Sequence, residues 1–159
     1  MFKGVNNKRS GEYNIPVSSE YNNEFKLLNP KYAKVDIQDD IIKQLNLESY
    51  RTYPDPWKTN YNSVDNFILA CYSKKVLTTM IEEHIEEYDY VMFMRPDCLY
   101  LDKINIDYFS LINDQNILIP NFAIEHCKHK INDRFAITNT NNYKIYGNIF
   151  DNLLNLSKK

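Results

Sequence analysis

The sequence predicts an α/β fold, and two observations lead to that class. Apolar residues recur at helical spacing in three stretches, residues 36–47, 64–87 and 143–154. Short apolar runs, at residues 89–94, 116–119 and 134–138, lie between the last two of these stretches. The chain has 159 residues, which fits one domain, and we expect residues 31–159 to form it.

The amino-terminal part of the chain carries few apolar residues. Residues 1–30 are polar and rich in asparagine, so we expect a loosely ordered arm. A helix over residues 36–47 follows, with Asp36 as its N-cap. An aromatic loop with two prolines, residues 50–57, comes next and carries the only tryptophan. Trp57 could stack on a sugar or a base, or it could plug the core.

The middle of the chain predicts a long helix followed by a buried strand. Ser63 is a suitable N-cap for the helix over residues 64–87, and Cys71 falls on its apolar stripe as an inert core residue. The acidic last turns oppose the helix dipole, so this end should fray or face solvent. Residues 90–94 follow with no polar break, which predicts a strand buried on both faces, as in a parallel sheet.

The carboxyl-terminal third predicts shorter elements. They are a helical turn at residues 107–112, a strand at 116–119 stopped by Pro120, a loop at 121–132 and a strand at 134–138. A last helix, capped by Thr140 or Asn141, should run to about Leu156.

Composition excludes several classes of function. The net charge of −2 provides no basic field for nucleic acid, and no apolar run approaches the roughly 20 residues of a membrane span. We see no signal peptide, and the three cysteines are too widely separated for a disulfide framework, so we expect a cytoplasmic protein. With 3 glycines the chain has no glycine-rich phosphate loop, and its many asparagines are typical of AT-rich coding.

The first candidate site is the corner Arg95-Pro96-Asp97, directly after the predicted buried strand. Open α/β sheets bind ligands at the carboxyl ends of their parallel strands. Asp97 is a hard oxygen ligand that suits Mg²⁺ or Mn²⁺, and the planar fork of Arg95 suits a diphosphate. The alternative is an ordinary surface ion pair at a tight turn.

A second candidate site combines His126 and His129 with Asp133 and Arg134. A neutral imidazole such as that of His129 can ligate a metal, and the Asp133 carboxylate can act as a general base. The alternatives are incidental histidines in a polar loop and a salt bridge at the start of a strand.

Two segments resemble a known family. Residues 88–97, YDYVMFMRPD, are similar to the YDYVIRxRPD segment of small GT-A-like glycosyltransferases of bacteria and large DNA viruses. Residues 132–137, NDRFAI, match a second segment of that family in the correct order, and the resemblance covers roughly residues 50–155. It implies an incomplete GT-A-like, Rossmann-like mixed sheet flanked by helices.

The resemblance also implies an activity, the transfer of a sugar from a nucleotide-sugar donor to a glycan or similar acceptor. Asp97 would replace the acidic motif that holds Mn²⁺ or Mg²⁺ and the donor diphosphate, with Arg95 beside it. Asp133 and Arg134 would lie near the donor or acceptor sugar.

The sequence departs from that family in two respects. Arg95 stands where the first acid of the family's metal motif would be, and residues 1–35 show no strand for the nucleotide base. The chain could therefore be a fragment, could need a missing amino-terminal half or an oligomer partner, or could be a non-catalytic remnant that has lost donor binding. A metal-dependent nuclease, prompted by Pro96-Asp97 and Asp102-Lys103, fails on the spacing of its motif.

Overall fold

The computed structural model describes residue 26 and residues 28–55, 58–95, 101–121 and 133–158. Within these ranges helices and strands are mixed, which confirms the α/β class at its coarse level. The chain divides into two compact units, residues 1–48 and 49–159. This division falls after Glu48, whereas the sequence predicted a domain from residue 31.

The described part of the first unit contains one α-helix, α1 (Gln38–Leu45). The predicted cap was wrong, because Ile37 holds the N-cap position and Asp36 instead pairs with Lys34 at 3.6 Å. Asn46 ends the helix in the left-handed conformation, with φ 45°, which asparagine tolerates better than most residues. A 3₁₀ helix, η2 (Leu47–Tyr50), leads into the second unit.

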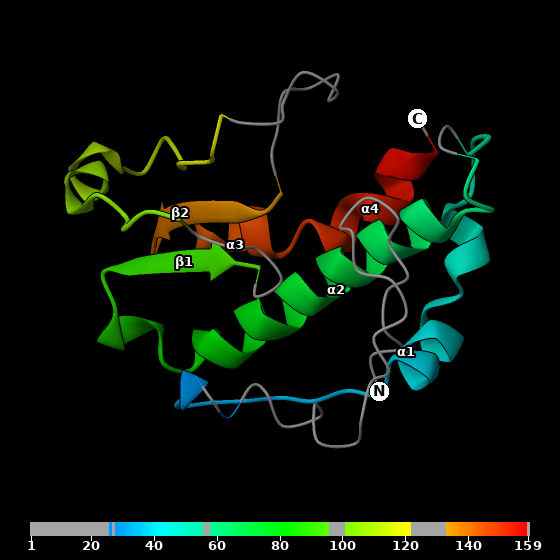
Figure 1. The fold of residues 1–159 in the computed structure, drawn as a ribbon, viewed down its shortest axis with the longest axis horizontal. Helices are drawn as coiled ribbons and strands as arrows, with labels where there is room; N and C mark the ends of the chain where they lie inside the picture. The colour runs from blue at the N-terminus through cyan, green and yellow to red at the C-terminus, as the bar shows by residue number, and fades with distance from the viewer. Residues whose placement is uncertain (1–25, 27, 56–57, 96–100, 122–132, 159) are drawn as a thin grey trace. The chain divides into compact units, whose positions relative to one another are not determined.

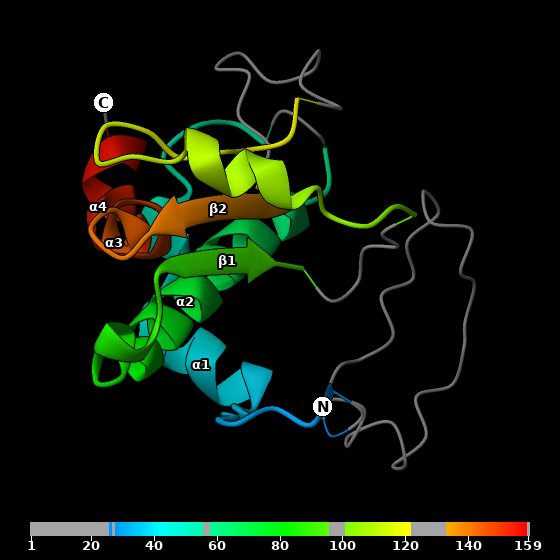
Figure 2. The same ribbon diagram turned by 90° about the vertical axis from the view of Figure 1, so that its left-hand side faces the viewer.

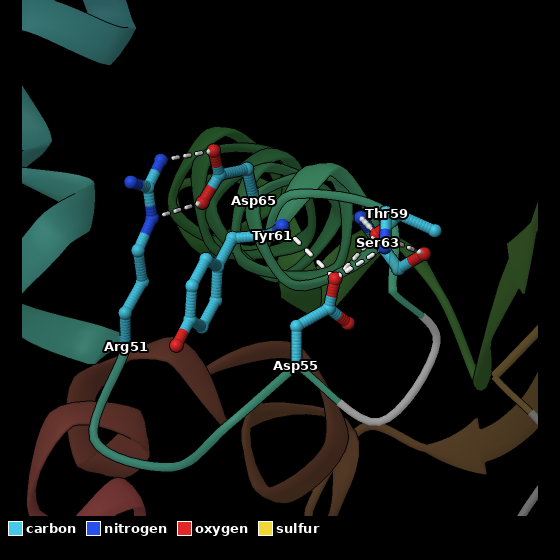
Figure 3. A network of polar contacts seen from close by, with 6 residues as sticks. All are labelled: Arg51, Asp55, Thr59, Tyr61, Ser63 and Asp65. Atoms are coloured by element: carbon cyan, nitrogen blue, oxygen red, sulfur yellow. Dashed lines mark hydrogen bonds and ion pairs between the residues drawn. The ribbon is translucent and has the colours of Figure 1, made fainter.

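The second unit is built along α2 (Asn62–Glu82), whose start differs from the prediction (Figure 1). Ser63 is not the N-cap but a helical residue, and its backbone N–H donates to the Thr59 hydroxyl oxygen at 3.1 Å. The Asp55 carboxylate accepts hydrogen bonds from the Thr59 hydroxyl and the Tyr61 N–H, both at 3.0 Å (Figure 3). These bonds hold Tyr61 at φ 65°, a left-handed conformation that costs roughly 1–2 kcal/mol.

A bidentate ion pair ties the loop after η2 to α2. The Arg51 guanidinium donates to both carboxylate oxygens of Asp65, at 2.7 and 3.3 Å, and lies 5.2 Å from the centre of the Tyr61 ring (Figure 3). Both charged groups are partly buried, so solvent screens this pair less than an exposed one. Residues 51–55 are thereby anchored to the first turn of α2.

The buried face of α2 is narrower than the sequence predicted. Ile68, Cys71 and Thr78 are 1% exposed, and their spacing places them on one side of the helix. Phe67, expected in the same stripe, is 43% exposed. The α-helix ends at Glu82 rather than residue 87, and the acidic residues that follow continue as the 3₁₀ helix η3 (Ile85–Glu87).

The sheet is antiparallel, which corrects the expectation of parallel pairing. β1 (Tyr90–Met94) pairs with β2 (Phe135–Asn139) in a register from Tyr90↔Asn139 to Met94↔Phe135. Burial on both faces was also wrong, because Val91 is buried while Met92 and Met94 are 40% and 43% exposed. An antiparallel sheet can leave one face open to solvent, even when that face carries apolar side chains.

On its other side, β2 meets a single residue of the segment predicted as a strand at 116–119. Leu118 and Ile137 exchange two backbone hydrogen bonds of 2.9 Å as an isolated antiparallel bridge. β2 is therefore flanked on both sides, and its middle residues Ala136, Ile137 and Thr138 are at most 1% exposed.

The predicted last helix is two helices, α3 (Tyr143–Gly147) and α4 (Phe150–Ser157), and both pack on α2 (Figures 1 and 2). Asn142 holds the N-cap position of α3, not Thr140 or Asn141. α3 approaches α2 closely at Gly147, since a Cβ atom there would lie 1.9 Å from the Thr78 hydroxyl oxygen. The buried contact requires glycine at the end of α3.

Asparagine side chains join the turn at residues 113–116 to the turn that follows β2. The Asn142 amide donates to the carbonyl oxygens of Asn113 and Asn116, at 3.1 and 3.3 Å. The Asn139 side-chain oxygen accepts the Asn142 N–H at 2.9 Å. Asn142 is 7% exposed, so these asparagines have a structural role beyond the composition bias noted from the sequence.

The turn predicted at residues 107–112 is confirmed as the 3₁₀ helix η4 (Ile106–Leu111). Its Phe109 ring packs edge-on against Tyr90 of β1, with centroids 4.9 Å apart. η4 thus covers the start of the open face of the sheet. Within the described ranges, none of the helices combines the length and the apolar character that crossing a membrane requires.

Candidate functional site

The candidate site lies where β1 ends and β2 begins. The Arg95 N–H donates to the Arg134 carbonyl oxygen at 3.2 Å, which extends the ladder one step beyond Met94↔Phe135. Arg95 and Arg134 therefore occupy directly facing positions, although 39 positions separate them in the sequence. By the alternation of an antiparallel pair they belong to the same face of the sheet as Phe93 and Ala136.

Tyr146 of α3 connects this end of the sheet to the helices. Its phenol O–H donates to the Asp133 carbonyl oxygen at 3.1 Å, and its ring packs on Phe93 with centroids 5.1 Å apart. The Lys74 ammonium of α2 lies 4.5 Å from the centre of the same ring. We call Lys74, Arg95, Asp133, Arg134 and Tyr146 the corner cluster.

The negative charge of Asp133 acts on two groups beside the corner cluster. Burial, and then the Asp133 carboxylate and the Cys71 thiol, raise the pKa of Tyr146 to about 12. Burial also raises the pKa of the Cys71 thiol, with Asp133 adding to the rise and the Lys74 ammonium opposing it. Cys71 is therefore held as a neutral thiol, as expected for a core residue.

The corner cluster has the chemistry of an oxyanion site. Arg95 and Arg134 place two guanidinium-bearing residues in directly facing positions of the strand pair. Guanidinium groups donate charge-assisted hydrogen bonds to anions with several oxygens, such as a phosphate or diphosphate. Asp133 supplies the carboxylate that a general base requires.

Three of the six predicted site residues are brought together, and the other three fall outside the described residues. Arg95, Asp133 and Arg134 come from separate sequence segments and meet at the corner, with Arg134 exposed and the other two partly buried. Asp97, Trp57 and His129 lie outside the described residues.

The described residues alone do not supply a metal centre. No three histidine, cysteine, aspartate or glutamate side chains in the described ranges are grouped closely enough to hold an ion. The expected ligands of Mg²⁺ or Mn²⁺, Asp97 and His129, both fall outside those ranges.

Sequence reasoning missed two members of the corner cluster. Tyr146 was expected only as part of an apolar helix face, and Lys74 was not singled out. Their positions in α2 and α3 give no sign that Lys74 lies over the Tyr146 ring or that Tyr146 bonds to Asp133, because both contacts depend on how the helices pack. A phenol in an otherwise apolar stripe was the one available sign, since a buried tyrosine hydroxyl needs a hydrogen-bond partner.

Comparison with known proteins found no protein or family similar to this chain. The sequence matches no family model, no curated protein and no solved structure. The function is therefore inferred from the residues of the corner cluster and their geometry.

Proposed function

We propose that this chain is a glycosyltransferase-type domain that transfers a sugar from a nucleotide-sugar donor to a glycan or similar acceptor. The observation that carries the proposal is the facing pair Arg95 and Arg134, with Asp133 adjacent, at one end of the sheet. Two arginines and a carboxylate match the needs of a diphosphate leaving group and an acceptor hydroxyl. The likeness of residues 88–97 and 132–137 to GT-A-like enzymes supports the same assignment.

In this proposal the residues have separate roles. Arg95 and Arg134 bind oxygens of the donor diphosphate, and Asp133 accepts the proton of the acceptor hydroxyl. Mg²⁺ or Mn²⁺, held by Asp97 and His129, would neutralise charge on the diphosphate. Trp57 would stack on the sugar or the base of the donor.

The first test is donor binding by the full chain, measured as a shift in the thermal unfolding midpoint with UDP-sugars and GDP-sugars plus Mn²⁺. A donor at one hundred times its Kd stabilises the native state by about 2.7 kcal/mol, which raises the midpoint by several degrees. Arg95→Ala or Arg134→Ala should weaken binding about tenfold or more, because each removes a charge-assisted contact. Lys43→Ala, at an exposed cation of α1, is the matched control and should leave the shift unchanged.

Two further variants separate binding from chemistry. Asp97→Ala should abolish the metal-dependent part of the shift. Asp133→Asn should keep the shift and reduce transfer about 100-fold or more, the usual contribution of a general base. The fold should survive this change, since Tyr146 binds the Asp133 backbone carbonyl and not its side chain. If the unfolding midpoint of a folded sample does not change with any of the donors, that result would count against an enzyme and favour a non-catalytic domain.

A further inference from the structure

The outer edge of β1 carries backbone groups that no described strand uses. The bond from the Arg95 N–H to Arg134 makes residues 95, 93 and 91 the positions that hydrogen-bond to β2. The Ile137 backbone points away from β1 and bonds to Leu118, which agrees with this alternation. The N–H and C=O groups of Tyr90, Met92 and Met94 must therefore point away from β2. Within the described ranges the sheet consists of β1 and β2, so no second described strand lies beside β1 (Figure 1).

The five residues of β1 themselves carry neither a charge nor a proline that would discourage strand pairing. Its side chains at the outward positions are apolar and 39–43% exposed: Tyr90, Met92 and Met94. No proline or charged residue interrupts β1, and exposed apolar edges of this kind serve as templates for another strand. A sheet of two strands is also marginal by itself and gains stability from further strands.

The two ends of β1 carry opposite charges at equal distances from its middle. Asp89 precedes the strand and Arg95 follows it, and each lies three residues from Met92. An antiparallel partner centred on Met92 would place residue 89 opposite residue 95, and 90 opposite 94. This edge is therefore complementary in charge to itself.

We propose that the outer edge of β1 pairs with the same edge of a second copy of this chain, antiparallel about Met92. The two strands exchange hydrogen bonds through residues 90, 92 and 94 of each copy, which uses every outward group of the strand. The result is a two-fold symmetric dimer with one continuous sheet in the order β2-β1-β1-β2. Any other antiparallel register uses fewer of these groups and separates the two opposite charges.

The geometry of the pairing strengthens the charge contact. Residues 89 and 95 fall in a pair without mutual hydrogen bonds, the kind in which Cα atoms are about 4.5 Å apart and side chains lie closest. Opposite charges in such a pair attract, and the two-fold axis repeats the contact. The second copy also places an Asp89 carboxylate beside Arg95 of the corner cluster, whether or not a ligand is bound there.

The mass of the full chain in solution tests the pairing. We expect sedimentation equilibrium over a concentration series to show twice the 19.0 kDa of the chain. Asp89→Arg sets two arginines opposite each other at both ends and should raise the dimer Kd about tenfold or more. The exchange Asp89→Arg with Arg95→Asp restores opposite charges and should restore the dimer. Glu83→Arg, an equal change of charge at an exposed residue after α2, should leave it intact.

A covalent test keeps the proposal falsifiable if the charge variants fold poorly. Facing residues in a hydrogen-bonded antiparallel pair have Cα atoms about 5.5 Å apart, within the range of a disulfide. Met92→Cys should therefore oxidise to a covalent dimer, whereas Leu77→Cys, exposed on α2, should not exceed the unaltered chain.

Three results would overturn the proposal. One is a chain that stays monomeric at every concentration of the sedimentation experiment, the result expected if another segment of the same chain covers the edge of β1. The second is a dimer that Asp89→Arg leaves intact in a folded sample, which places the interface elsewhere. The third is a Met92→Cys chain that cross-links no more than the Leu77→Cys control.

Discussion

Tyr146 is the residue at which the packing and the electrostatics of the corner cluster meet. Its ring contacts both Phe93 and the Lys74 ammonium, and its hydroxyl donates to the backbone carbonyl of Asp133. The pKa of about 12 follows from that position, because phenolate would be partly buried and close to a carboxylate.

The raised pKa of Tyr146 predicts a loss of stability at alkaline pH. The native state keeps the phenol proton up to about pH 12, while the unfolded chain releases it near 10.0. The contribution of the raised Tyr146 pKa to the free energy of unfolding is therefore fully present below pH 10 and is lost as the pH rises toward 12. Tyr146→Phe should remove the loss of stability that this phenol causes between pH 10 and 12. The urea midpoints of the variant and of the unaltered chain should therefore converge over this pH range.

Near neutral pH the same variant should cost about 0.5–1.5 kcal/mol, because the Asp133 carbonyl loses its donor. Tyr53→Phe is the control, since the Tyr53 side chain is 60% exposed. Parallel midpoint curves for Tyr146→Phe and the unaltered chain between pH 10 and 12 would contradict the assignment.

For individual residues, the sequence predicted which positions lie at the candidate site better than it predicted the contacts they make. Arg95, Asp133 and Arg134 could be proposed because each stands next to an apolar strand, a pattern visible locally. Lys74 and Tyr146 could not, because they reach the corner only through the packing of α2 and α3 against the sheet.

Among the elements, α2 and α3 approach each other closely at Gly147. Gly147 meets Thr78, a buried residue whose hydroxyl donates to the Lys74 carbonyl at 2.8 Å. A methyl group at position 147 has no room unless one helix moves.

Gly147→Ala should therefore destabilise the chain by about 1–3 kcal/mol, the usual cost of overpacking. Adding Thr78→Ala removes the hydroxyl that would lie 1.9 Å away and should recover part of the loss. Asn152→Ala, at an exposed position of α4, should change the free energy of unfolding by less than about 0.5 kcal/mol. Urea unfolding of these variants, of Thr78→Ala alone and of the unaltered chain measures these differences, and additive losses in the double variant would refute the steric explanation.

The predicted elements mostly exist, but their ends differ for identifiable reasons. α2 starts before residue 64 because the Thr59 hydroxyl accepts the Ser63 N–H and Asp55 holds the N-cap residue Tyr61, where the sequence predicted Ser63 as the cap. The last helix breaks after Gly147 because α3 and α4 must each lie against α2. Caps and breaks depend on neighbours that a pattern of apolar residues does not reveal.

For the whole molecule, the division after Glu48 predicts that residues 49–159 fold without the first unit. The buried residues of the sheet and of α2, and the Arg51–Asp65 ion pair, all lie within that range. A chain of residues 49–159 should show helical circular dichroism and one cooperative thermal transition.

A shorter chain of residues 62–159 is the matched comparison. It lacks Arg51 and Asp55, and its free energy of unfolding should be lower by about 1.5–3 kcal/mol, the range of a hydrogen bond to a charged group. A chain of residues 49–159 that melts without cooperativity would show that the two units depend on each other.

The order of the elements and the residues beside the corner followed from the sequence, because hydrophobic periodicity, prolines and flanking charges act over a few residues. The antiparallel direction of the sheet, its exposed methionines and the contacts of Tyr146 did not. β1 and β2 are separated by a long connection, and five apolar residues in a row are compatible with either direction of pairing. Direction, register and the open edge of β1 are set by contacts between distant segments, and such contacts exist only once the chain has folded.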